Sequence, residues 1–92
     1  MALTRGSFRS YEYERMVILF SMFDGQKEIS CAISTSAMDD LESLTRSKPD
    51  QREAQFVRLR DRIEEQAARK FLAMEFEGAP PGIILRSIDF RK

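Results

Sequence analysis

The chain has 92 residues, of which 42% are hydrophobic and 33% are charged, and 15 basic and 15 acidic residues give it a formal net charge of zero. This length predicts a single domain over residues 1–92, and no apolar run reaches the roughly 18–20 residues that cross a bilayer. The sequence contains no histidine, which removes the commonest general base and the imidazole metal ligands. We therefore expect a protein that is not an enzyme, with no catalytic, cofactor-binding or metal-binding residues and no membrane partner.

Residues 1–16 form a polar lead-in, which we interpret as an extended segment that contributes a short edge strand near Leu3–Thr4. Its aromatic residues are Phe8, Tyr11 and Tyr13. The segment also contains arginines, and segments that bind nucleic acids often combine basic and aromatic residues in this way. Glu12 and Glu14 cancel the local positive charge, and the chain as a whole is neutral, so the sequence disfavours nucleic acid as the partner.

The clearest signal is a hairpin formed by Val17–Phe23 and Glu28–Ser34. Apolar side chains alternate along both runs, which is typical of paired antiparallel strands with one buried face. A four-residue loop over 24–27 sets the register, and the predicted partners are Met22 and Ile29, Phe20 and Cys31, and Ile18 and Ile33. A two-residue turn at Asp24-Gly25 would shift the pairing by two residues and leave the same side chains inward.

Cys31 is the single cysteine of the chain, and the alternation places it on the inward face of its strand. No neighbouring charge in the sequence would lower the pKa of its thiol, so we interpret it as a small buried hydrophobe. One cysteine cannot form an internal disulfide, and this usage favours a cytoplasmic protein.

Two helices are predicted after the hairpin. Residues 34–36 offer N-caps for a short helix of about nine residues, with acidic residues in its first turn. A long helix is predicted from Asp50, which forms a capping pattern with Glu53, to about Phe76. At about 100° per residue, its apolar side consists of Phe56, Leu59, Ile63, Ala67, Phe71 and Met74. The opposite side is charged, so the helix is expected to cover one side of a core.

A last strand is predicted over Ile83–Phe90, after a break rich in glycine and proline. Two helices can cover one face of a small sheet, yet Leu19 and Phe23 of the hairpin point to the other face. That second face is more apolar than contact with water explains. Either the aromatic residues of the N-terminal segment fold across it, or a second copy or a partner protein covers it.

Two arginines stand at apolar positions. Arg60 lies within the edge of the apolar side of the long helix, one turn before Glu64. Burial of an unpaired guanidinium is costly, so Arg60 either binds an anion or forms an ion pair that ties the helix to the sheet or the N-terminal segment. Arg86 interrupts the apolar face of the last strand, where it marks either the edge of the sheet or an anchor for a partner.

Several short motifs occur in a fixed order along the chain. Arg9-Ser10-Tyr11-Glu12 followed by Arg15 is similar to an R-S-Y-D-x-x-R motif, and the other matching residues are Ile18, Phe20, Phe23, Asp24, Glu28, Ile29, Ser36, Ala37, Met38, Leu41, Phe56, Arg60, Arg62, Ile63, Asp89 and Phe90. In these motifs the chain resembles a family of short bacterial proteins, domain-of-unknown-function family 1488. It departs from the family at Ser21-Met22, where members often have an aromatic residue and a glycine. The resemblance spans about residues 8–90 and implies a small α+β protein, but no activity, ligand or catalytic residue.

We therefore predict an α+β domain in which the hairpin and the C-terminal strand form a small antiparallel sheet, with one short and one long helix on one face. The predicted function is that of a non-catalytic interaction or regulatory module that forms a homo-oligomer, such as a homodimer, or binds a partner protein. The alternatives are a weak nucleic-acid-binding protein that uses the N-terminal arginines and tyrosines, and a small-anion sensor that uses Arg60. The candidate interaction residues are Arg9, Tyr11, Arg15, Leu19, Phe23, Arg60 and Arg86.

Overall fold

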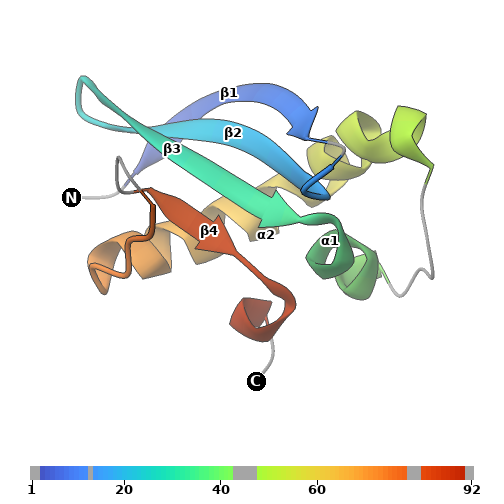
Figure 1. Ribbon diagram of the computed structural model, residues 1–92. Coiled ribbons are helices and arrows are strands. Elements are labelled where there is room, and N and C mark those ends of the chain that lie inside the picture. Colours follow the sequence, from blue (N-terminus) through green and yellow to red (C-terminus); the bar gives the residue numbers. More distant parts are fainter. Residues whose placement is uncertain (1–2, 13, 43–47, 79–81, 91–92) are drawn as a thin grey trace.

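The computed structural model describes residues 3–12, 14–42, 48–78 and 82–90. Its strands are β1 (Thr4–Glu12), β2 (Val17–Asp24), β3 (Lys27–Ser34) and β4 (Ile83–Leu85). Its helices are α1 (Thr35–Glu42) and α2 (Arg52–Leu72), with short 3-10 turns η1 (Pro49–Gln51) and η2 (Ser87–Phe90). The strands form one sheet, and the long helix α2 runs across one of its faces (Figure 1). The predicted α+β fold is confirmed.

The β2–β3 hairpin has the predicted register. Its partners include Met22 and Ile29, Phe20 and Cys31, and Ile18 and Ile33. The strands extend further towards the loop than predicted, because Asp24 also pairs with Lys27 and leaves a two-residue connection. Gly25 in this connection has a φ of 65°, a left-handed conformation that glycine adopts without steric cost. The side chains of Ile18 and Ile33 are fully buried, as the alternation requires.

β1 is an edge strand of nine residues, much longer than the strand predicted near Leu3–Thr4. It pairs antiparallel with β2, and its register shifts on either side of Phe8. The Phe8 ring packs on the helix side of the sheet, with its centroid 5.8 Å from that of Phe56. The lead-in therefore extends the sheet instead of folding across its second face, because the open edge of β2 offers unpaired backbone donors and acceptors. Tyr13 lies outside the described residues.

The C-terminal strand differs from the prediction in direction and in length. β4 runs parallel to β3, so the sheet is mixed and not fully antiparallel. Parallel neighbours need a long crossover connection, which the chain between β3 and β4, with both α-helices, supplies. The strand ends before Arg86 and does not continue to Phe90. The reason is that the carboxylate of Asp89 accepts a hydrogen bond of 2.7 Å from the Arg86 N–H and closes the turn η2.

The two helices agree with the prediction in place but not in every boundary. Helix α1 is capped as expected, because the Ser34 hydroxyl accepts a hydrogen bond of 3.1 Å from the Ala37 N–H. Its first turn contains no acidic residue, so that part of the prediction is wrong. Helix α2 begins after Asp50, and its N-cap residue is Gln51, which makes no side-chain capping hydrogen bond, so the predicted capping pattern is wrong. The helix also ends before Phe76, because the backbone becomes left-handed at Met74, with a φ of 59°.

The core lies between the sheet and α2. The predicted apolar side of the helix is buried at Phe56, Leu59, Ile63 and Ala67. The Phe20 ring of β2 packs against Phe56 with a centroid distance of 5.1 Å. Met74 is 77% exposed and does not belong to this side, because the helix has ended before it.

Candidate interaction surface

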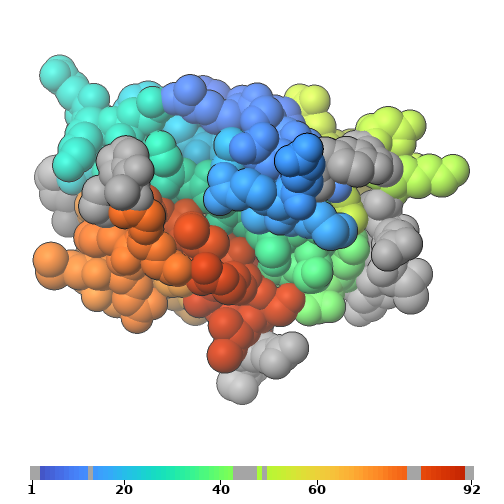
Figure 2. All heavy atoms as spheres, viewed as in Figure 1, coloured from blue at the N-terminus to red at the C-terminus, as the bar shows by residue number. Residues whose placement is uncertain are grey.

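The face of the sheet that points away from α2, called the open face from here on, is formed by alternate residues of the strands. Its members include Ser10, Glu12, Val17, Leu19, Phe23, Glu28, Ser30, Ala32, Ser34 and Ile84. Figure 2 views the molecule from this side, and segments coloured from blue through green to red all reach its surface. The open face therefore brings together the beginning, the middle and the end of the chain.

Apolar side chains lie along the open face from one end of β2 to the other and on β4. Val17, Leu19, Phe23 and Ile84 are half-buried, and Ala32 is 6% exposed. β1 lies beside β2 and not over it, so the larger of these side chains keep part of their surface open to water. Several partly exposed apolar side chains on one face of a sheet are typical of an interaction site.

Arginines on the open face and around it are accompanied by carboxylates. The ion pairs are Arg9 with Glu28, Arg15 with Glu12, and Arg86 with Glu77. The last pair is joined by two hydrogen bonds, of 2.7 and 2.9 Å, which lower the pKa of the Glu77 carboxyl. All three pairs are solvent-exposed and contribute little to stability. The face thus carries balanced charge instead of a basic field.

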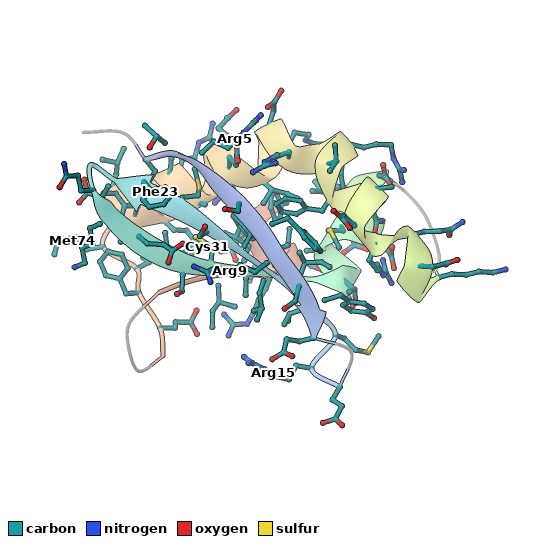
Figure 3. The ribbon with its side chains drawn as sticks, turned by 90° about the horizontal axis from the view of Figure 1, so that it is seen from above. Arg5, Arg9, Arg15, Phe23, Cys31 and Met74 are labelled. Atoms are coloured by element: carbon teal, nitrogen blue, oxygen red, sulfur yellow. The ribbon has the colours of Figure 1, made fainter. Side chains whose placement is uncertain are left out.

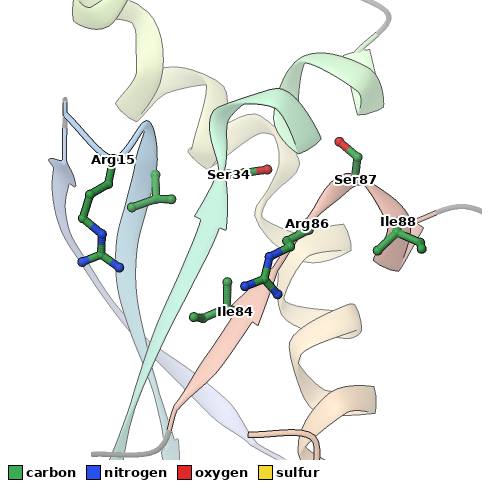
Figure 4. Close-up of a pocket in the computed structure, with 7 residues that line it drawn as sticks. Arg15, Ser34, Ile84, Arg86, Ser87 and Ile88 are labelled. Atoms are coloured by element: carbon green, nitrogen blue, oxygen red, sulfur yellow. The ribbon is translucent and has the colours of Figure 1, made fainter. Parts of the chain in front are cut away.

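A hollow of about 590 Å³ lies at the end of the open face where β2 begins and where β3 and β4 end. It is lined by Arg15, Val17, Ser34, Ile84, Arg86, Ser87 and Ile88. Figure 4 shows Arg15 on the β2 side of the hollow and Arg86 on the β4 side. Ile88 stands at its rim with 69% of its surface exposed. Guanidinium groups bind carboxylates through paired N–H donors, so this arrangement suits a carboxylate on an apolar surface.

Arg60 and Tyr11 lie on the helix side of the sheet, apart from the open face. The Nε atom of Arg60 donates to Glu64 at 3.0 Å, and its Nη2 atom donates to the carbonyl oxygen of Gly6 at 2.8 Å. Its guanidinium carbon also lies 5.5 Å from the centre of the Phe56 ring. These contacts tie α2 to the N-terminal strand, as one of the two interpretations of Arg60 proposed. Tyr11 is half-buried against the core.

Two arginines near opposite ends of β1 lie at different distances from helix α2. Arg5 lies beside α2, where it donates to Glu64 at 2.9 Å and to Asp61 at 2.8 Å. Arg15 lies beyond the other end of β1, away from that helix (Figure 3). Of the seven predicted interaction residues, the structure gathers five on or around the open face, namely Arg9, Arg15, Leu19, Phe23 and Arg86.

Both edge strands of the sheet have a backbone carbonyl bound by a basic side chain from α2. Arg60 donates a hydrogen bond to the Gly6 carbonyl oxygen of β1, as described above. Lys70, only 7% exposed, donates from Nζ to the carbonyl oxygen of Ile84 in β4 at 2.8 Å and pairs with Asp89 at 3.2 Å. Occupied carbonyls make an edge a poorer template for an added strand. The open face is therefore better suited to association than the edges.

A buried polar network joins α1 to α2, and the sequence analysis missed it. The Arg52 side chain is 3% exposed and donates to Asp39 and to Gln55, both at 2.7 Å. Gln55 in turn donates to Asp39 at 3.0 Å. At the exposed end, hydrogen bonds from Arg58 lower the pKa of the Glu42 carboxyl. The charges are visible in the sequence, but the contact between the two helices is not.

The described residues offer few groups for covalent or metal chemistry. Burial raises the pKa of the Cys31 thiol to about 12, so the thiol stays protonated and unreactive at neutral pH. Within these residues, no group of three or more cysteines and carboxylates is placed to hold a metal ion. In the part of the chain that the structure describes, no helix combines the length and apolar character needed to cross a bilayer.

The comparisons with known proteins agree with one another. Residues 5–84 match the family described as "Protein of unknown function (DUF1488)". The fold is similar to the crystal structure of a protein of unknown function from the DUF1488 family of Shewanella loihica PV-4, with a TM-score of 0.79 and 19% sequence identity. The similarity covers 92% of this chain and 93% of that chain. No curated protein matches the sequence. This chain belongs to the DUF1488 family, whose function is unknown.

Proposed function

We propose that the protein is a small, non-catalytic cytoplasmic module that associates with a second copy of itself through the open face. The observation that carries this proposal is the set of half-buried apolar side chains on that face, Val17, Leu19, Phe23 and Ile84, which the N-terminal strand does not cover. Removal of such side chains from water is the main driving force of association between proteins.

The charges around the open face favour a protein over a polyanion as the partner. Arg9 and Arg86 are already paired with Glu28 and Glu77, so the face lacks the unbroken basic stripe on which nucleic-acid binding depends. A self-complementary surface, in contrast, needs both signs of charge, because a two-fold interface brings the same patch together with itself.

The contacts of Arg60 argue against the anion-sensor alternative. Two of its nitrogen atoms are already bound, one by Glu64 and one by the Gly6 carbonyl. An anion that took over these two nitrogen atoms would displace both partners and loosen the contact between α2 and β1. We therefore assign Arg60 a positioning role in the fold.

Sedimentation velocity over a wide range of protein concentration tests the proposed self-association. We expect the mass of two chains at high concentration and dissociation on dilution. Leu19→Glu should shift the equilibrium towards the monomer, because it places a charge at the centre of the open face. Val57→Glu is the matched control, since Val57 lies on α2 and is 56% exposed. A wild-type protein that stays monomeric at every concentration would contradict the proposal.

A further inference from the structure

Strand β3 connects two features of the open face that have opposite charge. At its beginning stands Glu28, whose side chain is 40% exposed. At its end, Ser34 lies in the hollow that Arg15 and Arg86 flank. We propose that two copies of the chain pack their open faces together around a two-fold axis, so that Glu28 of each copy enters the hollow of the other. This inference rests on the self-association proposed above and specifies how the two copies meet.

The geometry of β3 supports this arrangement. Glu28 and Ser34 are six residues apart on the same side of one strand, which corresponds to about 20 Å at the usual rise per residue. Cys31 lies midway between them. A two-fold axis that lies between the two open faces, perpendicular to β3 and level with Cys31, exchanges the two ends of β3, and the beginning of the strand in one copy then faces its end in the other. One axis therefore forms both Glu28 contacts.

The shape of the open face permits the two sheets to approach. Ser30 and Ala32, the open-face residues of β3 nearest to this axis, have small side chains. Larger apolar side chains flank them on the neighbouring strands, where Leu19 pairs with Ala32 from β2 and Ile84 pairs with it from β4. Packed sheets lie about 10 Å apart and interdigitate their side chains. Because the axis keeps each strand opposite its own copy, the larger side chains of β2 and β4 meet their counterparts in the second copy, and the small residues of β3 do not obstruct this contact.

The charged groups retain the capacity for the new contact. The Arg15 side chain is 63% exposed, and its nearest carboxylate among the described residues is Glu12 at 3.9 Å, a loose contact. Arg86 binds Glu77 through its terminal nitrogens while 51% of its side chain remains exposed. A carboxylate has about four acceptor positions, so Glu28 can keep Arg9 and accept further donors from the second copy.

The apolar floor of the hollow gives the contact specificity. Val17, Ile84 and Ile88 line the hollow together with the two arginines. When a second copy covers them, water leaves the site, and charged hydrogen bonds in a drier environment are stronger than those at an open surface. The same ion pairs would contribute little if the two faces met in another register.

Charge reversal tests the pairing. Glu28→Arg and Arg86→Glu, each alone, should raise the dissociation constant of the dimer about tenfold or more, because each places like charges together in the hollow. The double variant Glu28→Arg with Arg86→Glu should regain most of the wild-type affinity. In an equimolar mixture of the two single variants, the mixed dimer joins the two introduced charges, which are opposite, in one contact and the unchanged Glu28 and Arg86 in the other. Both contacts are attractive, so the mixture should associate more tightly than either variant alone.

Matched controls separate this effect from a general change in charge. Glu65→Arg and Arg69→Glu reverse an exposed pair on α2, where the side chains are 65% and 67% exposed, and should leave the dissociation constant unchanged. Thermal unfolding followed by circular dichroism verifies that each variant is folded. Arg15→Glu is a second test of the hollow that leaves the Arg86–Glu77 pair intact.

The outcomes distinguish the two proposals. If Leu19→Glu dissociates the dimer while the reversals in the hollow act no more strongly than those on α2, the self-association stands and the Glu28 contact is wrong. If the single reversals weaken the dimer but the double variant does not recover, the pairing is also wrong. If the wild-type protein is monomeric throughout, the proposed function itself fails.

Discussion

The two faces of the sheet use the same strands in different ways. On the helix side, Ile18, Phe20 and Ile33 have at most 2% of their surface exposed, and α2 covers them. On the open face, Leu19 and Phe23 of the same β2 strand are only half-buried. Alternation along a strand makes this difference possible, because neighbouring side chains point to opposite sides.

The polar groups differ between the two sides in the same way. On the helix side, Arg52 and Lys70 are nearly buried and have hydrogen-bonded partners at well-defined distances. Around the open face, Arg9, Arg15 and Arg86 form exposed ion pairs. Buried polar groups must be satisfied within the chain, whereas exposed ones can exchange partners. The polar contacts on the helix side therefore stabilise the fold, whereas the charged groups around the open face can form new contacts with a second copy.

The largest expected effect is that of truncation on the helix side. Phe20→Ala removes a side chain that is 2% exposed and in contact with Phe56. We expect a loss of about 3–5 kcal/mol in the free energy of unfolding, measured by urea denaturation at a concentration where the protein is monomeric. Phe23→Ala, on the same strand but on the open face, should cost about 1 kcal/mol or less. Equal losses at the two positions would show that the faces do not differ as described.

A somewhat smaller loss is expected when the buried network between the helices is broken. Asp39→Ala removes the carboxylate that pairs with the buried Arg52 guanidinium and leaves Gln55 as its acceptor among the residues that the structure describes. We expect a cost of about 3 kcal/mol, because an uncompensated buried charge is strongly destabilising. The double variant Asp39→Ala with Arg52→Met should recover part of this stability. Urea denaturation measures the free energy of unfolding of both variants. If the double variant is no more stable than Asp39→Ala, the unpaired charge of Arg52 is not the source of the lost stability.

A third prediction concerns the close approach of β1 to β2. A Cβ atom at Gly6 would lie 2.3 Å from the carbonyl oxygen of Ser21, which is backbone and cannot move aside cheaply. Gly6→Ala should therefore cost about 1–3 kcal/mol. It should also increase hydrogen exchange at the Ser7 amide, which donates to the Ser21 hydroxyl at 3.1 Å. Ser7→Ala is the control, since it adds no atom at this approach. Unchanged exchange and stability in Gly6→Ala would contradict the observed contact.

The smallest effect is expected from pH. Hydrogen bonds from Arg58 and Arg86 lower the pKa values of the Glu42 and Glu77 carboxyls in the folded protein. Their contribution is therefore complete at pH above the unfolded glutamate value of about 4.3 and is lost as the pH falls through the lower folded values. The melting temperature should be flat between about pH 7 and 5 and should decrease slightly more in wild type than in Glu42→Gln below about pH 4. Identical acid profiles would show that the Glu42 pair contributes nothing to stability.

Much of the fold was predictable because it depends on local patterns. The alternation of Ile18, Phe20 and Met22 against Ile29, Cys31 and Ile33 predicted the register of the hairpin. The apolar side of α2 at Phe56, Leu59 and Ile63 followed from helical spacing in the same way. Capping by Ser34 was equally local, because the hydroxyl and the amide that it binds are three residues apart. The sequence also indicated that the second face of the sheet is partly apolar.

The candidate site was less predictable because it depends on which segments meet. Arg15 and Arg86 are 71 positions apart in the sequence, and the parallel placement of β4 beside β3 brings them to one hollow. Sequence reasoning expected β4 to be antiparallel and to continue to Phe90. It had no means of knowing that Asp89 closes a turn and binds Lys70, because neither contact leaves a periodic pattern.

Local patterns in the amino-acid sequence were enough to predict the fold class, the hairpin register, the two helices and the apolar character of both faces of the sheet, since each depends on side chains a few residues apart. The folded chain was needed to establish the direction of β4, the length of β1, the partners of Arg52 and Arg60, and the hollow between Arg15 and Arg86. These features depend on contacts between distant segments. Such contacts are selected by packing of the whole chain and not by any local preference.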